Sequence, residues 1–144
     1  EGTYDFVEKT HAAHIVARDQ DGRFLMIREY RYLLEKISIA QPAGGIEPSE
    51  SPVDGAKREF REETGYEAAT WIEVGKCAGM PFLTNEWLHV FYATDLTRVG
   101  THDDEVTDVF LMTAQEIDDA IRDGRIWDGH AIAAWYMAKL HLGL

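Results

Sequence analysis

The sequence contains a single cysteine and no long apolar run. Because Cys77 is alone, an intramolecular disulfide is excluded, which suits a reducing compartment. No stretch of about 18 apolar residues exists, so no membrane-spanning helix and no membrane partner are expected. The first residues, EGTYDF, lack the basic region and apolar run of a signal peptide. We therefore expect a cytoplasmic protein.

Positive charge is also scarce. Lysine and arginine total 14 against 26 aspartates and glutamates, which gives a formal net charge of −12. A surface this acidic repels nucleic acid and other polyanions, so we expect no nucleic-acid partner. If the substrate carries phosphates, a bound cation must reverse the local field.

The length of 144 residues suits one domain covering 1–144. Alternating apolar residues predict strands at 11–18, 23–32, 37–40, 69–77, 87–94 and 107–112. The turn at 19–22 should join the first two strands as a hairpin. Helices are expected at 52–64, 113–124 and about 129–140, capped by Ser51, Thr113 and Asp128. This mixed order of strands and helices indicates an α/β or α+β fold.

The chain is organised around the segment 44–66, GGIEPSESPVDGAKREFREETGY. Its helix should begin at Pro52, which suits the first helical position, and end before Gly65, which suits a left-handed C-terminal residue. At about 100° per residue, one stripe of this helix is suited to the core. That stripe consists of Val53, Ala56, Phe60 and Thr64.

The carboxylates of this helix fall into two groups with different explanations. Glu62 lies four residues after Arg58, and an intrahelical ion pair accounts for both. Glu59 and Glu63, also four apart, lie together at the margin of the buried stripe, where like charges repel. A hard divalent cation such as Mg²⁺ takes oxygen ligands and would stabilise this arrangement.

The segment 44–66 resembles the box of the Nudix hydrolases, G-x5-E-x7-R-E-U-x-E-E-x-G-U, where U is bulky and apolar or aromatic. Every defined position matches: Gly44, Glu50 and then the run 58–66, REFREETGY. The resemblance implies a metal-dependent pyrophosphohydrolase. It also implies a mixed α/β fold, the Nudix-type α/β/α sandwich, with a central mixed sheet and the box loop-helix.

The resemblance also implies roles for individual residues. Glu59 and Glu63 would bind Mg²⁺ or Mn²⁺ together with the backbone carbonyl of Ala43, whose alternative role is that of a small residue in a tight turn. Glu62 would bind a further ion or polarise water. Arg58 would orient the carboxylates, and Glu50 would pair with a box arginine.

Other segments resemble the ADP-ribose pyrophosphatase group within the family. Pro81 lies sixteen residues after Gly65 and opens Pro81-Phe82-Leu83-Thr84-Asn85-Glu86, which resembles P-G-x-S-x-E with Phe82 in place of glycine. The runs REYRY at 28–32 and QPAG at 41–44 are similar to that group too. Pro81 and Glu86 are therefore expected at the substrate. Arg28 and Arg31 are further candidates, although their three-residue spacing on a strand points them to opposite faces, so at most one readily reaches a phosphate.

Glu105, in an acidic loop before the last strand, corresponds to a glutamate that serves similar enzymes as general base or further metal ligand. A solvated loop residue is the alternative. The resemblance implies hydrolysis of ADP-ribose to AMP and ribose 5-phosphate by a homodimer. Alternatives are a nucleotide-sugar or nucleoside triphosphate hydrolase, or a non-catalytic module that senses nucleotides.

Overall fold

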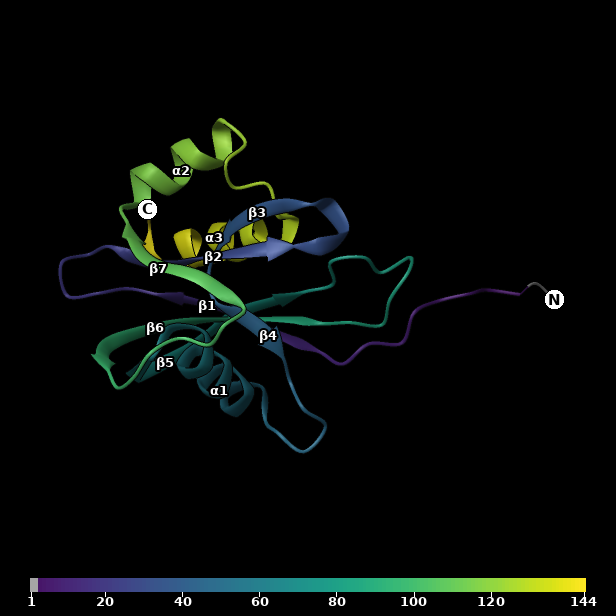
Figure 1. The fold of residues 1–144 in the computed structure, drawn as a ribbon. Coiled ribbons are helices and arrows are strands. Elements are labelled where there is room, and N and C mark those ends of the chain that lie inside the picture. Colours follow the sequence, from purple (N-terminus) through teal and green to yellow (C-terminus); the bar gives the residue numbers. More distant parts are fainter. Residues whose placement is uncertain (1–2) are drawn as a thin grey trace.

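The computed structural model describes residues 3–144, which form three α-helices and seven strands (Figure 1). The strands are β1 (Ala12–Ala17), β2 (Phe24–Arg31), β3 (Lys36–Ala40), β4 (Ala43–Gly45), β5 (Tyr66–Cys77), β6 (Leu88–Arg98) and β7 (Val106–Met112). The helices are α1 (Pro52–Thr64), α2 (Ala114–Arg122) and α3 (Gly129–Leu142), and a short 3-10 turn, η1 (Tyr32–Leu34), follows β2.

The strands divide between two sheets. The first is mixed, in the order β4-β1-β6-β5, with β1 parallel to β6 and antiparallel to β4. The second is antiparallel, in the order β3-β2-β7. The predicted mixed α/β class is confirmed, and α1 packs mainly on the mixed sheet, with a smaller contact to β7.

The predicted hairpin between the first two strands is wrong. β1 and β2 belong to different sheets, and within residues 3–144 their backbones pair at one isolated bridge, between Arg18 and Phe24. β6 pairs along the whole of one edge of β1, and β4 pairs with residues 12–14 on the other, so β1 is built into the mixed sheet and not paired with β2. The turn itself is present, because Asp19 accepts hydrogen bonds from the N–H groups of Asp21 and Arg23.

Strand β1 carries core residues on both faces, because successive side chains of a strand point to opposite sides. Ile15 belongs to the cluster that Phe60 of α1 completes. Val16 belongs to the opposite cluster, in which Trp135 of α3 packs edge-on against Phe24 of β2. Fully burying a side chain such as Phe60 contributes about 1.5–3 kcal/mol. Figure 1 shows α1 on the outer side of the four-stranded sheet and α2 beyond the three-stranded one.

The helix boundaries follow from their caps. α1 spans the predicted residues: the Ser51 side chain accepts from the Asp54 N–H, and Gly65 adopts a left-handed φ of 71°. Thr113 and Glu116 form the predicted capping box of α2. Asp128 caps α3, which ends two residues later than predicted.

Two strands are longer than their apolar patterns indicate. β5 begins at Tyr66, directly after α1, and β6 continues to Arg98, with which Tyr66 pairs. In the added residues the apolar side chains of Tyr66, Ala68 and Leu96 are only partly buried and alternate over two or three positions, which is too short a pattern to mark a strand. No helix within residues 3–144 has the length and apolar character needed to cross a bilayer.

Candidate active site

Strand β4 approaches α1 so closely that any side chain at Gly44 would displace the carboxylate of Glu59. A Cβ atom there would lie 2.1 Å from Cδ and 2.2 Å from Oε2 of Glu59. Pairing of Ala13 with Gly44 helps to hold β4 in this position. The first glycine of the segment therefore makes room for a carboxylate beside the backbone of β4.

Arg58 joins the preceding loop, β4 and α1 in one charged network. Its Nε and Nη2 donate to the two carboxylate oxygens of Glu50 at 2.8 and 3.0 Å. Its Nη1 donates to Glu59 Oε1 at 2.7 Å and to Glu62 Oε2 at 3.2 Å, and Nη2 donates to the Gly45 carbonyl at 2.8 Å. The hydrogen bonds from Arg58 lower the pKa of Glu50 to about 2. Glu50 thus pairs with a box arginine, and the same arginine fixes the Glu59 carboxylate.

Glu63 is largely buried beside β4. Its Oε2 accepts a hydrogen bond from the Ala43 N–H at 2.8 Å. Burial raises the pKa of Glu63 to about 8; the Ala43 hydrogen bond opposes this rise, and the nearby charge of Glu59 adds to it. Burial also raises the pKa of Glu59, against the lowering effect of Arg58. Two adjacent carboxylates whose ionisation is disfavoured would gain from a bound cation.

The donor set suits a hard divalent cation, because carboxylate and backbone oxygens are its preferred ligands. Arg58 occupies Oε1 of Glu59 and leaves Oε2 free of its hydrogen bonds. The Ala43 N–H bond to Glu63 places residue 43 against the carboxylates. Glu62 is more open, with 52% of its side chain exposed. Within residues 3–144, no three His, Cys, Asp or Glu side chains already form an ion-binding cluster.

The loop between β6 and β7 is fastened to the C-terminal end of α1. The Gly100 N–H donates to the Gly65 carbonyl at 3.0 Å, and the Asp103 N–H donates to the Glu62 carbonyl at 2.9 Å. Glu105, exposed on this loop, is thereby held close to the end of α1. Its chemical role stays a prediction.

Two carboxylates that the sequence analysis did not select also reach this region, Glu29 and Asp103. The charges of both help to raise the pKa of Glu63. The pKa of Glu29 is itself raised by burial, against the opposing effect of Arg31, and the charge of Glu105 adds to the rise. A signal for Glu29 was available: a residue two positions from Arg31 on a strand shares its face.

Both arginines of the run 28–32 already have acidic partners. Arg28 forms an ion pair with Asp108, and its guanidinium carbon lies 4.2 Å from the centroid of the Phe110 ring. Arg31 Nη1 lies 2.7 Å from Glu29 Oε1. A phosphate would therefore have to compete with a carboxylate for either guanidinium.

Pro81 and Glu86 lie on the β5–β6 loop (residues 78–87), beside the N-terminal segment (Figure 1). Pro81 is exposed. The Glu86 side chain is 8% exposed, and its Oε1 lies 2.8 Å from Lys9 Nζ. Within residues 3–144, no hydrogen bond or ion pair joins Pro81 or Glu86 to the carboxylates of α1. The structure therefore bonds the loop of Glu105 to the box helix, and Glu86 to Lys9 of the N-terminal segment.

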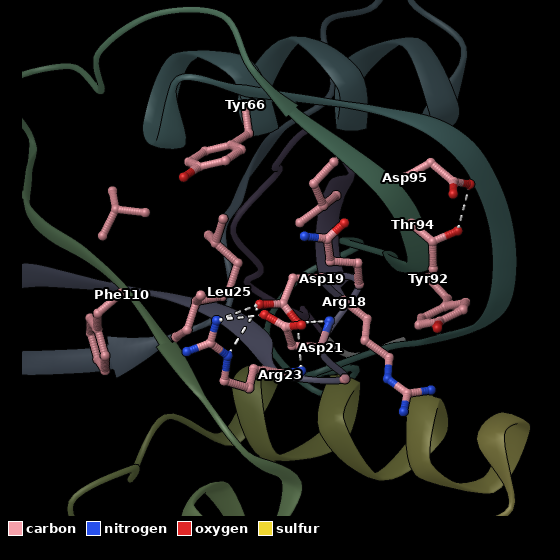
Figure 2. Close-up of a pocket in the computed structure, with 15 residues that line it drawn as sticks. Arg18, Asp19, Asp21, Arg23, Leu25, Tyr66, Tyr92, Thr94, Asp95 and Phe110 are labelled. Atoms are coloured by element: carbon pink, nitrogen blue, oxygen red, sulfur yellow. Dashed lines mark hydrogen bonds and ion pairs between the residues drawn. The ribbon is translucent and has the colours of Figure 1, made fainter.

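A cavity of about 780 Å³ opens between the turn at 18–23, β6 and β7 (Figure 2). Its aromatic lining consists of Tyr66, Tyr92 and Phe110, and no carboxylate of α1 lines it. A smaller hollow of about 380 Å³ lies beside α1, and its lining includes Arg58, Glu62 and Gly100. The smaller hollow, not the larger one, adjoins the charged network.

Comparison with known proteins gives matches by family model, by sequence and by fold. Residues 8–135 match the family model described as "NUDIX domain". The chain is 31% identical over 144 residues to the methanol dehydrogenase activator of Bacillus methanolicus, covering 97% of this chain and 78% of that protein. It is 27% identical over 128 residues to the ADP-ribose pyrophosphatase of Bacillus subtilis (strain 168), covering 86% and 69%. The fold matches the crystal structure of an ADP compounds hydrolase with a TM-score of 0.82 and 24% identity, covering 92% of this chain and 72% of the other.

Proposed function

The chain belongs to the NUDIX domain family and is a Nudix pyrophosphohydrolase, and from this premise we propose that it cleaves ADP-ribose to AMP and ribose 5-phosphate. More broadly, its substrate is a nucleoside diphosphate linked to a second moiety. The similarity to the Bacillus subtilis ADP-ribose pyrophosphatase supports this choice. Pro81 and Glu86, at the positions that resemble the ADP-ribose group, support it as well.

One observation carries the proposal: two largely buried carboxylates of α1 lie against the backbone of β4. Glu59 lies where a Cβ of Gly44 would be, and Glu63 is bonded to the Ala43 N–H. Keeping both ionised at neutral pH requires a positive charge beyond the one Arg58 supplies to Glu59. A divalent cation provides that charge, and a diphosphate substrate needs the same cation in a protein of net charge −12.

Glu59 and Glu63, with the Ala43 carbonyl, would hold Mg²⁺ or Mn²⁺, and Glu62 would hold a further ion. A metal held there would neutralise charge on the diphosphate and lower the pKa of water. Arg58 keeps the Glu59 carboxylate in place through its 2.7 Å hydrogen bond. Glu105 accepts the proton that the water loses as its oxygen bonds to phosphorus and the bridging P–O bond breaks.

The remaining residues bind substrate in this proposal. Arg28 or Arg31 exchanges its carboxylate partner for a phosphate oxygen, which suits a guanidinium because it recognises both groups by paired N–H donors. Pro81 and Glu86 would contact the substrate from the β5–β6 loop. Positioning and charge neutralisation dominate such phosphoryl transfer, so no covalent nucleophile is required.

We further propose that the protein is a cytoplasmic homodimer. Large apolar side chains are exposed on the N-terminal segment and the β5–β6 loop, namely Tyr4, Phe6, Val7, Phe82 and Leu83. Exposed apolar side chains on two neighbouring segments are typical of a subunit interface. Sedimentation equilibrium should give twice the chain mass of 16.3 kDa. A monomer at micromolar concentration would contradict the dimer.

The substrate is tested with a panel assayed by release of phosphatase-sensitive phosphate. ADP-ribose should have a higher kcat/KM than nucleotide sugars, dGTP, 8-oxo-dGTP or diadenosine polyphosphates. Omitting divalent metal should abolish turnover. If a nucleoside triphosphate is the best substrate, the assignment based on Pro81 is wrong and only the pyrophosphohydrolase activity stands.

A further inference from the structure

The N-terminal segment runs alongside the second half of the β5–β6 loop (Figure 1). The Val7 N–H donates to the Leu83 carbonyl at 2.8 Å, and Val7 forms a parallel bridge with Thr84. The Lys9 N–H donates to the Asn85 side chain at 2.9 Å. We call residues 4–11 the N-terminal strap, because residues along its length are bonded in the same order to residues 82–87 of the loop.

Lys9 also neutralises a carboxylate that the loop buries. Its Nζ lies 2.8 Å from Glu86 Oε1, and the exposed fractions of the two side chains are 47% and 8%. A buried carboxylate is costly unless it is paired and hydrogen-bonded. Within residues 3–144, Lys9 is the ion-pair partner of Glu86. Without Lys9, Glu86 would stay buried and uncompensated or move into solvent, and either outcome disturbs the loop.

The first half of the loop is held by other means. A Cβ at Gly79 would lie 1.8 Å from Nε2 of His130, so the loop backbone passes directly against α3. The Thr84 N–H donates to the Met80 carbonyl at 2.9 Å, which closes a turn with Pro81 exposed on it. The sheet and α3 therefore fix the start of the loop, and the strap fixes its end. The turn that carries Pro81 is connected to that end through Thr84, which pairs with Val7 of the strap.

We propose that Lys9 is a positioning residue for substrate binding. Acting through Glu86, it sets the conformation of the β5–β6 loop and hence the direction in which Pro81 faces the substrate. The proposal rests on the proposed function, in which this loop binds substrate. Because Lys9 lies outside the Arg58 network and the Glu105 loop, its loss should weaken substrate binding and leave the chemical step intact.

The test compares Lys9→Met with Lys9→Arg and with Lys36→Met. For the best substrate of the panel, Lys9→Met should raise KM about tenfold, equivalent to about 1.4 kcal/mol, with kcat within twofold. Lys9→Arg retains the charge and the donor, so it should keep KM near the wild-type value. Lys36 is exposed on β3 and has no ion-pair partner within residues 3–144, so Lys36→Met controls for the loss of one positive charge.

Amide hydrogen exchange without substrate gives a readout that does not depend on activity. The N–H groups of Val7 and Lys9, which donate across to the loop, should exchange at least tenfold faster in Lys9→Met and at the wild-type rate in Lys9→Arg. Faster exchange with a higher KM supports the proposal. Unchanged exchange, faster exchange with unchanged KM, or a fall in kcat in place of the KM effect each overturns it. The substrate panel tests the proposed function separately, since exchange is measured on the free enzyme.

Discussion

Replacing Gly44 by alanine tests whether turnover depends on the close approach of Glu59 to β4. The added Cβ would lie 2.1 Å from Cδ and 2.6 Å from Oε1 of Glu59, well inside van der Waals contact. The carboxylate must therefore move by more than ~1 Å, and a displacement of that size at a catalytic group costs about 10²-fold in rate. We expect kcat to fall by that factor, which corresponds to about 2.7 kcal/mol of activation free energy.

Stability should change much less than activity in Gly44→Ala. The Glu59 side chain can swing aside, and losing its partly exposed pair with Arg58 costs at most about 1 kcal/mol. Exchanging glycine for alanine restricts the unfolded chain and offsets about 0.4–1 kcal/mol of that loss. The free energy of unfolding from urea titration should therefore stay within about 1 kcal/mol of wild type.

The adjacent residue provides the matched control. A Cβ at Gly45 would meet only Thr10 Oγ1, at 3.5 Å, which is an ordinary contact, and the Gly45 carbonyl that accepts from Arg58 is kept. Gly45→Ala should retain kcat within about threefold. If Gly44→Ala retains kcat to the same degree, or if both variants lose it equally, the reasoning from Glu59 is refuted.

Three further outcomes are expected. Glu63→Gln should abolish nearly all turnover at saturating Mg²⁺ while the melting temperature holds or rises, since a buried carboxylate is removed; activity within about threefold of wild type would exclude Glu63 as a metal ligand. Glu105→Gln should lower kcat by about two orders of magnitude with KM little changed and flatten the acidic limb of the pH–rate profile; an effect confined to the KM for Mg²⁺ would make Glu105 a metal ligand instead. Burial lowers the pKa of His14 from 6.5 to about 3, so the unfolded state binds a proton more readily than the folded state. The neutral His14 therefore contributes fully to the free energy of unfolding above pH 6.5, and this contribution is lost as the pH falls towards 3. At pH 5 the free energy of unfolding should be lower by about 2 kcal/mol for this reason. In urea titrations at pH 7 and pH 5, the His14→Gln variant should lack this difference; an equal pH dependence in the variant would contradict the account.

Local signals allowed the box helix to be predicted to the residue. Its cap at Ser51, its first-turn proline and its left-handed Gly65 all act within a few positions of the helix ends. The pairing of Glu50 with a box arginine was likewise anticipated from the motif. These features depend on interactions between residues close together in the sequence, so they can be predicted from it.

The features that were predicted wrongly or missed from the sequence all depend on contacts between distant segments. The turn at 19–22 reverses the chain, but the partners of β1 are β4 and β6, which no local pattern reveals. Glu29 and Asp103 join the site because β2 and the β6–β7 loop converge on α1. Lys9, on a segment without alternation, gave no indication that it pairs with Glu86, 77 positions away in the sequence.

The pairing of β1 also determines the order in which the chain can fold during synthesis. Ala12 of β1 lies beside Leu88 of β6, so the strand buried on both faces lacks one neighbour until more than half of the chain has been made. At about 5–20 residues per second, the ribosome needs several seconds to cover that interval. During that time an apolar strand has an unpaired edge, which other chains can join. Fragments that end before β6 should therefore aggregate, and a slow, nonlocal docking of β6 onto β1 should limit the rate at which the enzyme first becomes active.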